Sequence, residues 1–220
     1  MTLQELVERV LAGPDPAAIV QAGHPVLRGR AEPYTGQLRA ATLVDLIALM
    51  RATMHAAPGV GLAAPQIGVP LALAVLEDPG ALDPELAAVR ERTPLDFRVL
   101  VNPHYEAASE TMASFYEGCL SLSGWQAVVA RHRTVRLTGQ DETGAELDEL
   151  VHGWQARIVA HETDHLRGEL YIDHAELRSL ATNEGIGAAL SSEPVPTTAA
   201  RVLGFDLYLD AEHSSGLGPG

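Results

Sequence analysis

The chain has 220 residues, of which 46% are hydrophobic and 20% are charged, and this composition is that of a folded globule rather than a disordered chain. Its 29 acidic and 15 basic side chains give a net charge of −14, which repels phosphate backbones and anionic lipids and argues against nucleic acid and membrane partners. All the basic side chains are arginine, so mechanisms that need a lysine, such as Schiff-base formation, are excluded.

The cysteine content and the N-terminal residues indicate a reducing compartment. A single cysteine cannot form an internal disulfide, and the opening residues MTLQELVERV lack the basic and apolar regions of a secretory signal. No uncharged apolar run approaches the roughly 18 residues that a membrane helix needs. We therefore expect a cytoplasmic protein.

The N-terminal part of the chain predicts two helices joined by an extended segment. Residues 2–12 carry a capping box of Thr2 and Glu5 before apolar residues at helical spacing, which predicts a short amphipathic helix. The prolines that follow predict an extended segment that wraps the core. A second helix is expected to begin at a Thr42 cap and to end before Pro58.

The rest of the chain is predicted to be mostly β-structure, with one more long helix. Short apolar runs separated by turn residues predict strands between residues 69 and 152, interrupted at 78–96 by a charged surface loop with one helical turn at 84–90. Residues 153–167 read as a third helix that ends at Gly168. From Gly185 the composition predicts a partly ordered tail.

The third helix carries an H-E-x-x-H pattern at His161, Glu162 and His165. Imidazoles four residues apart share one face of a helix and can bind the same metal ion. Glu162 lies about 100° round the helix, where its carboxylate can exchange protons with a water molecule without being a ligand. The pattern therefore indicates a metal-dependent hydrolase, which needs a third ligand.

Three sources for that ligand are considered. The metzincin pattern fails because Tyr171 stands where its last histidine would be. A thermolysin-like site would use Glu184, but the helix carrying this residue would have to continue through Gly185 and Gly187. The third candidate is Cys119, since a thiolate and two imidazoles leave one open metal position. An inert buried thiol is the alternative for this cysteine.

Three sequence blocks resemble the signature motifs of the peptide deformylase family. They are GVGLAAPQIG at residues 59–68, EGCLSLSG at 117–124 and HETDHL at 161–166, and they occur in the order and spacing of that family. The similarity runs from about Ile19 to Ile172. The resemblance implies removal of the N-formyl group from the formyl-methionine of nascent polypeptides, with release of formate.

The same resemblance implies roles for individual residues. Cys119, His161 and His165 would bind one divalent metal, typically ferrous iron, with zinc, nickel or cobalt in isolated samples. Glu162 would be the general acid and base, while the Gln66 side-chain amide and the Leu120 backbone N–H would stabilise the oxyanion. The residues implied to line the substrate cleft are Val60, Gly61, Glu117, Gly118 and Ile158.

We therefore expect an α+β fold in which antiparallel or mixed β-sheets pack around the metal-binding helix. Residues 1–184 would form one catalytic domain and residues 185–220 a partly ordered acidic tail. The tail is too acidic to support docking to the ribosome, and a monomer or small homo-oligomer is expected.

Two other functions and one surface cluster complete the predictions. Because EGCLSLSGW departs from the commoner EGCLSVPG, a specialised amidase acting on another N-formyl substrate is one alternative. A catalytically silent paralogue is the other, although the intact ligand set and Glu162 speak against it.

The Arg131, Arg133 and Arg136 cluster is interpreted as the solvated face of a strand.

Overall fold

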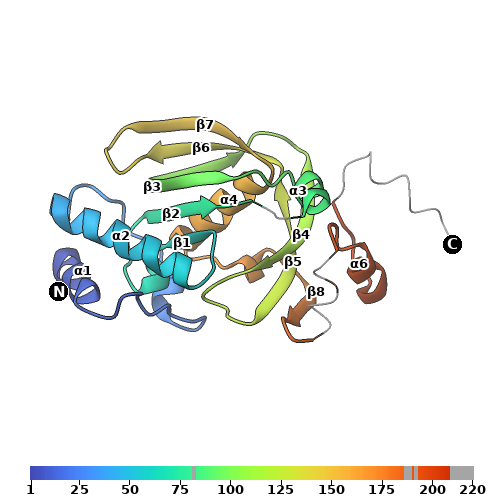
Figure 1. The fold of residues 1–220 in the computed structure, drawn as a ribbon, viewed down its shortest axis with the longest axis horizontal. Helices are drawn as coiled ribbons and strands as arrows, with labels where there is room; N and C mark the ends of the chain where they lie inside the picture. Colours follow the sequence, from blue (N-terminus) through green and yellow to red (C-terminus); the bar gives the residue numbers. More distant parts are fainter. Residues whose placement is uncertain (81–82, 186–189, 191–192, 209–220) are drawn as a thin grey trace.

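The computed structural model describes residues 1–80, 83–185, 190 and 193–208, in which helices surround two β-sheets (Figure 1). The α-helices are α1 (Leu3–Leu11), α2 (Ala40–Ala56), α3 (Pro84–Arg90), α4 (Gly153–Arg167) and α6 (Thr197–Leu203). The strands are β1 (Gly61–Ala63), β2 (Leu73–Asp78), β3 (Leu95–Ala107), β4 (Met112–Gly118), β5 (Trp125–His132), β6 (Thr134–Gln140), β7 (Glu146–His152) and β8 (Ala175–Thr182). Short 3-10 helices are η1 (Pro25–Arg28), η2 (Ala64–Ile67) and η3 (Tyr171–Asp173).

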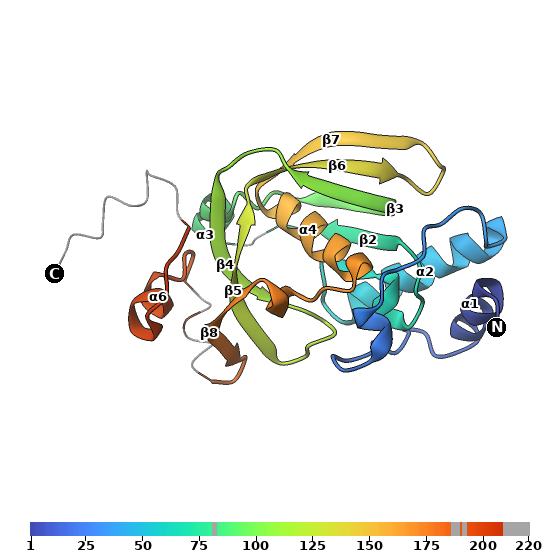
Figure 2. The same cartoon turned by 180° about the vertical axis from the view of Figure 1, so that it is seen from behind.

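The two sheets are antiparallel and share α4 between them. The larger sheet has the strand order β1-β2-β3-β6-β7 and the smaller one the order β4-β5-β8. Helix α4 contacts strands of both sheets, and Figure 2 shows it running between them. The predicted α+β fold with a central helix carrying the H-E-x-x-H residues is therefore confirmed.

The predicted capping box at α1 is present, but the predicted cap of α2 is wrong. Thr2 accepts a hydrogen bond from the Glu5 backbone, and Glu5 accepts one from Thr2 in return. Helix α2 begins before Thr42, because the Gln4 side chain accepts a hydrogen bond from the Arg39 backbone N–H and donates one to the Thr42 hydroxyl. A contact from another helix thus replaces the local cap.

The core consists of two main apolar layers, one on each face of the larger sheet. The first joins α1 and α2 to the sheet and includes the fully buried Leu46 and Met50. The second lies between the sheet and α4 and includes Leu100 and Leu137. Burial on both faces explains why the strands read as nearly continuous apolar runs. It also fixes α4 rigidly, because one side of this helix is packed against the sheet.

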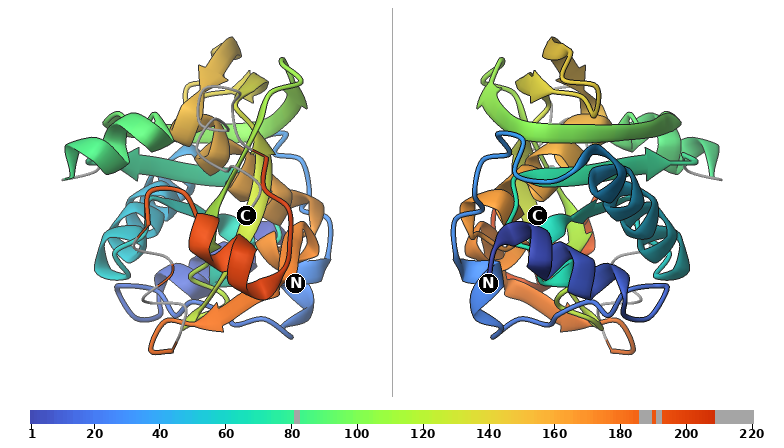
Figure 3. Two further views of the ribbon diagram at one scale, coloured as in Figure 1. Left: turned by 90° about the vertical axis from the view of Figure 1, so that its right-hand side faces the viewer. Right: turned by 90° about the vertical axis from the view of Figure 1, so that its left-hand side faces the viewer.

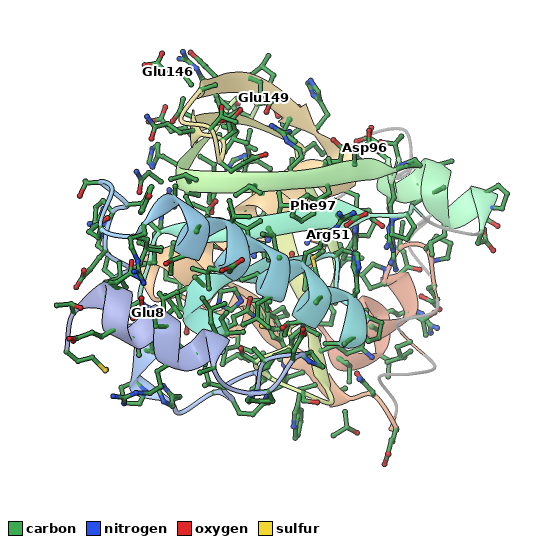
Figure 4. The ribbon with its side chains drawn as sticks, turned by 60° about the vertical axis from the view of Figure 1, so that its left-hand side comes forward. Glu8, Arg51, Asp96, Phe97, Glu146 and Glu149 are labelled. Atoms are coloured by element: carbon green, nitrogen blue, oxygen red, sulfur yellow. The ribbon has the colours of Figure 1, made fainter. Side chains whose placement is uncertain are left out.

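Arg51 on α2 packs on Phe97, which lies against the first apolar layer. Its guanidinium lies 4.3 Å from the centre of the Phe97 ring, and it forms hydrogen bonds with both carboxylate oxygens of Glu77, so that the helix is joined to β2 and β3 (Figure 4). The hydrogen bonds with Arg51 outweigh desolvation and lower the pKa of Glu77. The described helices include none with the length and apolar character required to cross a bilayer.

The proline-rich segment before α2 wraps the core as expected, and it is tied to the loops that follow β1 and β4. The Val20 backbone N–H donates to the Gln66 carbonyl, and the Ala22 N–H donates to the Ser121 carbonyl. Further along, Ala31 N–H donates to the carbonyl of Leu166 on α4. One segment therefore fastens three separate parts of the chain together.

The C-terminal segment covers the outer face of the smaller sheet. Helix α6 lies within the predicted tail and packs near β8, as seen at the front of the left view in Figure 3. Its fully buried Ala199 belongs to an apolar cluster with Tyr116 of β4 and Val128 of β5. The rest of the predicted tail, residues 186–189, 191–192 and 209–220, lies outside the described residues.

Candidate metal centre

Helix α4 presents His161 and His165 on one face. Their ring centres lie 5.1 Å apart, and the helix ends at Gly168, whose φ of 82° permits the left-handed turn. Burial holds the pKa of His165 well below its usual range, so its imidazole is neutral, which is the form that binds a metal. The spacing predicted from the sequence thus produces two adjacent imidazoles.

Cys119 is brought to the same place from the end of β4. Its Sγ lies 3.2 Å from Nε2 of His165, and one ligand atom from each of Cys119, His161 and His165 lies within 4.8 Å of the others. This spacing fits one metal ion bound by three residues, because zinc-type bonds to sulfur and nitrogen are about 2.0–2.3 Å long. A thiolate with two imidazoles suits a divalent transition metal. Glu184 is exposed and does not belong to this group.

Glu117 fixes the orientation of His161. Its Oε2 lies 3.0 Å from Nδ1 of His161, which leaves Nε2 of that ring to face a metal. Arg131 donates to both oxygens of the same carboxylate, and Arg157 donates to Oε1 at 2.5 Å. Burial alone would raise the pKa of Glu117, but the two guanidinium groups and His161 hold it well below its usual range.

The buried ion cluster behind the ligands was not predicted, and the interpretation of Arg131 as part of a solvated face was wrong. Arg131 is only 7% exposed and also donates to Asp164, which in turn accepts a hydrogen bond from Tyr105. The available signal was that Arg131 alternates onto the same face of β5 as the buried Ala127 and Val129. Arg136 is exposed, as expected.

Glu162 follows His161 on α4, lines the same cleft as His161 and Cys119, and is buried. Only 4% of the residue is exposed, its Oε2 has no hydrogen-bond partner in the described part of the chain, and burial raises its pKa to about 7. A carboxylate of this pKa can both accept and return a proton near neutral pH. Gly61 of β1 allows the close approach, because a Cβ at residue 61 would lie 2.3 Å from Glu162 Oε1.

The side-chain amide of Gln66 is oriented by three neighbours. Its Oε1 accepts a hydrogen bond from the Ala63 backbone, and its Nε2 lies 3.3 Å from the Ser121 hydroxyl and 3.6 Å from Cys119 Sγ. The amide N–H groups are therefore directed toward Ser121 and toward Cys119, one of the candidate ligands. Leu120, whose backbone N–H is the other predicted donor, follows Cys119 directly and lines the same cleft.

A cleft of about 750 Å³ contains nearly all the predicted site residues. Those that line it are Val60, Gly61, Gln66, Glu117, Gly118, Cys119, Leu120, Ile158, His161 and Glu162, whereas His165 lies behind them. Glu117 was expected to line the substrate cleft; it lines this cleft, but its carboxylate is turned toward Arg131, Arg157 and His161.

Comparisons with known proteins show the family of the chain. The family described as polypeptide deformylase matches residues 16–180. The chain is 58% identical over 205 residues to peptide deformylase 1 of Streptomyces coelicolor, covering 93% of this chain and 94% of that protein. It is 54% identical to peptide deformylase 1 of Bifidobacterium longum, with 86% of each chain covered. The peptide deformylase of Synechococcus elongatus, solved in complex with actinonin, superposes with a TM-score of 0.61 at 30% identity, covering 88% of this chain and 89% of that one.

Proposed function

The chain belongs to the peptide deformylase family, and we propose that Cys119, His161 and His165 hold the metal with which it removes N-formyl groups from nascent polypeptides. The observation that most directly supports this proposal is that one sulfur and two imidazole nitrogens lie within 4.8 Å of one another. Ferrous iron is the proposed ion in the cell, because the thiolate softens the donor set; zinc, nickel or cobalt would occupy the same position in isolated protein.

The proposed reaction adds water to the formyl carbon and breaks its bond to the amine nitrogen. The divalent ion, when bound, supplies the Lewis acidity that polarises water and the formyl group. Glu162 accepts a proton from the attacking water and delivers a proton to the leaving amine, so that formate and a free N-terminus are released. Its pKa of about 7 supports this double role.

Two hydrogen-bond donors are assigned to the negative charge that develops on the formyl oxygen. They are the Gln66 Nε2 group and the Leu120 backbone N–H, which flank Cys119 on different loops. The contact of Gln66 Oε1 with Ala63 supports this assignment, because it leaves only the amide nitrogen to face the site. Ser121 restrains the same amide.

The peptide is proposed to lie along β1, which is the edge strand of the larger sheet. An edge strand offers backbone groups with which an extended peptide can pair. Val60, Gly61, Gly118 and Ile158 would contact the substrate, whereas Glu117 would act through His161. The cytoplasm is the proposed location, with the chain acting as a monomer or small homo-oligomer and without ribosome docking through its acidic tail.

The experiment measures formate release from formyl-methionyl peptides by protein purified without oxygen, together with its metal content. Glu162→Ala should lose turnover while keeping its metal, and Cys119→Ala should lose both. Glu184→Gln is the matched control and should behave like the parent, because Glu184 is exposed and outside the ligand group. Full metal content in Cys119→Ala, or loss of turnover in Glu184→Gln, would overturn the ligand assignment. Preference for another formamide over formyl-methionine would favour the specialised amidase.

A further inference from the structure

The cleft extends well beyond the metal centre along α4. Trp154, Ile158 and Glu162 line it at intervals of four residues, so the lined part of the helix is about 12 Å long at 1.5 Å per residue. The chemistry is confined to the end that holds Glu162. On the proposed function, a peptide whose formyl group lies at Glu162 would have this other end, near Trp154, available for its first side chain.

Tyr116 connects this cleft to the C-terminal segment. It lines the cleft and is only 6% exposed, and its hydroxyl has no hydrogen-bond partner in the part of the chain that the structure describes. The same side chain belongs to an apolar cluster that contains Ala199 and Leu203 of α6 and Phe205 after it. The wall of the cleft at Tyr116 is thus supported from behind by residues near the end of the chain.

Trp154 has a similar connection through Arg90. The Arg90 guanidinium lies 5.1 Å from the centre of the Trp154 ring, and it donates hydrogen bonds to the backbone carbonyls of Glu193 and Pro194. A backbone carbonyl can hold a guanidinium in place only while its own segment is docked. The C-terminal segment therefore contributes to the position of Arg90 on Trp154, a ring that Arg92, Arg157 and Phe115 also approach.

The segment also covers the free edge of β4. Tyr208 accepts a hydrogen bond from the Ser114 backbone and donates its own backbone N–H to the Ser114 hydroxyl, both at 3.0 Å. Strand β4 is the edge of the smaller sheet, and it leads directly into Glu117 and Cys119. An edge strand that is covered in this way is held in one position.

We propose that the segment 193–208 is a specificity-determining part of the active site, because it fixes Tyr116 and Trp154 and so limits the length of the first side chain that the cleft accepts. This inference rests on the proposed function. It moves the end of the catalytic unit from residue 184 to Tyr208. If the segment no longer supported Tyr116 and Trp154, the cleft should accept longer side chains and bind methionine less tightly. One methylene in a fitted pocket changes selectivity by about 10-fold or more.

The test compares two neighbouring residues of α6. Leu203 packs in the cluster with Tyr116, whereas Val202 is 59% exposed. Formate release is measured with formyl peptides whose first side chain is either methionine or a linear chain two methylenes longer. Leu203→Ala should raise the ratio of kcat/KM for the longer chain to that for methionine about fivefold or more, mainly through KM. Val202→Ala should leave this ratio unchanged, and the metal content should be the same in both variants.

A second variant keeps the inference testable if Leu203→Ala does not fold. Arg90→Gln removes the link between Trp154 and the carbonyls of Glu193 and Pro194, and it should shift the ratio in the same direction. An unchanged ratio in the folded variants, even with a lower Tm, would show that the segment contributes to stability but not to specificity, and would overturn the proposal. A parent protein that releases no formate from either peptide would instead contradict the proposed function.

Discussion

Gly61 and Glu162 are in direct contact, and the geometry leaves no space for a side chain at residue 61. A Cβ there would lie 2.3 Å from Oε1 and 2.7 Å from Cγ of Glu162. Because the Glu162 side chain is buried against Gly61, a side chain at residue 61 would have to displace the carboxylate from the position proposed for proton exchange. The glycine of the first motif therefore makes room for the residue of the third motif that is proposed as acid and base.

Gly61→Ala should lower kcat by about 100-fold or more, because a displacement of about 1 Å at a reacting group has an effect of this size. The metal content should not change, since the three atoms nearest to the new methyl group all belong to Glu162, which is not a proposed ligand. The measurement is formate release at saturating substrate, with metal analysis of the same sample. Gly29→Ala is the control, because a Cβ at residue 29 would meet nothing closer than 3.9 Å. Normal turnover in Gly61→Ala would show that the carboxylate tolerates displacement.

The stability of the metal-free protein should depend on pH through Glu162. Burial raises the pKa of this residue from 4.5 to about 7, so the folded state binds a proton that the unfolded state has lost between these values. The free energy of unfolding should therefore fall as the pH rises from 4.5 to 7, by ~3 kcal/mol at 1.36 kcal/mol per pH unit. Below pH 4.5 this loss should be absent.

Glu162→Gln removes the titrating group and provides the comparison. Denaturant unfolding of the metal-free parent and variant should give curves whose difference grows across this pH range in favour of the variant. A constant difference between pH 4.5 and 8 would mean that the Glu162 carboxyl ionises without cost.

Glu117→Gln should weaken metal binding by about 10- to 100-fold, which is the usual effect of removing a partner that orients a histidine ligand. The neutral amide leaves Arg131 and Arg157 without their shared carboxylate and holds Nδ1 of His161 less firmly. Competition with a chelator would measure the affinity for Zn²⁺ or Co²⁺. Glu106→Gln is a suitable control, since Glu106 pairs with His104 at the exposed surface. Equal affinity in both variants would contradict the assigned role of Glu117.

Two residues of α2 test the first apolar layer. Leu46 is fully buried and Val44 is 64% exposed, so Leu46→Ala should lower the free energy of unfolding by about 2–5 kcal/mol, whereas Val44→Ala should change it by less than about 0.5 kcal/mol. Thermal or urea unfolding of the two variants gives both values. Similar losses in the two variants would place the layer on the wrong face of the helix.

The parts of the structure that could be predicted from the sequence are those fixed by local patterns. The helix with His161 and His165 matches its predicted range of 153–167, and the turn at 84–90 is a helix capped by Asp83. The predicted start of α2 was wrong because the side chain of Gln4, which is distant in the sequence, takes the place of the expected Thr42 cap. Such a contact leaves no local signal.

The buried charged residues also depend on contacts between distant parts of the chain, which local sequence patterns do not reveal. Alternation places Arg131 on the apolar face of β5, but its charge partners Glu117 and Asp164 come from two other elements and leave no signal near it in the sequence. Arg157 was not predicted to be part of the site, because a charged residue one turn before His161 is equally typical of an exposed helix face. Only the tertiary fold brings the opposite charges together.

The backbone hydrogen bonds from Val20 to Gln66 and from Ala22 to Ser121 join parts of the chain that are made at different times during synthesis. Val20 must wait for the first motif and Ala22 for the second before they can form these bonds, and the proposed metal centre is incomplete until α4 has followed. During synthesis, the ligands converge only after His165 has left the ribosome. An enzyme whose substrates are unfinished chains is therefore inactive until most of its own chain has been made.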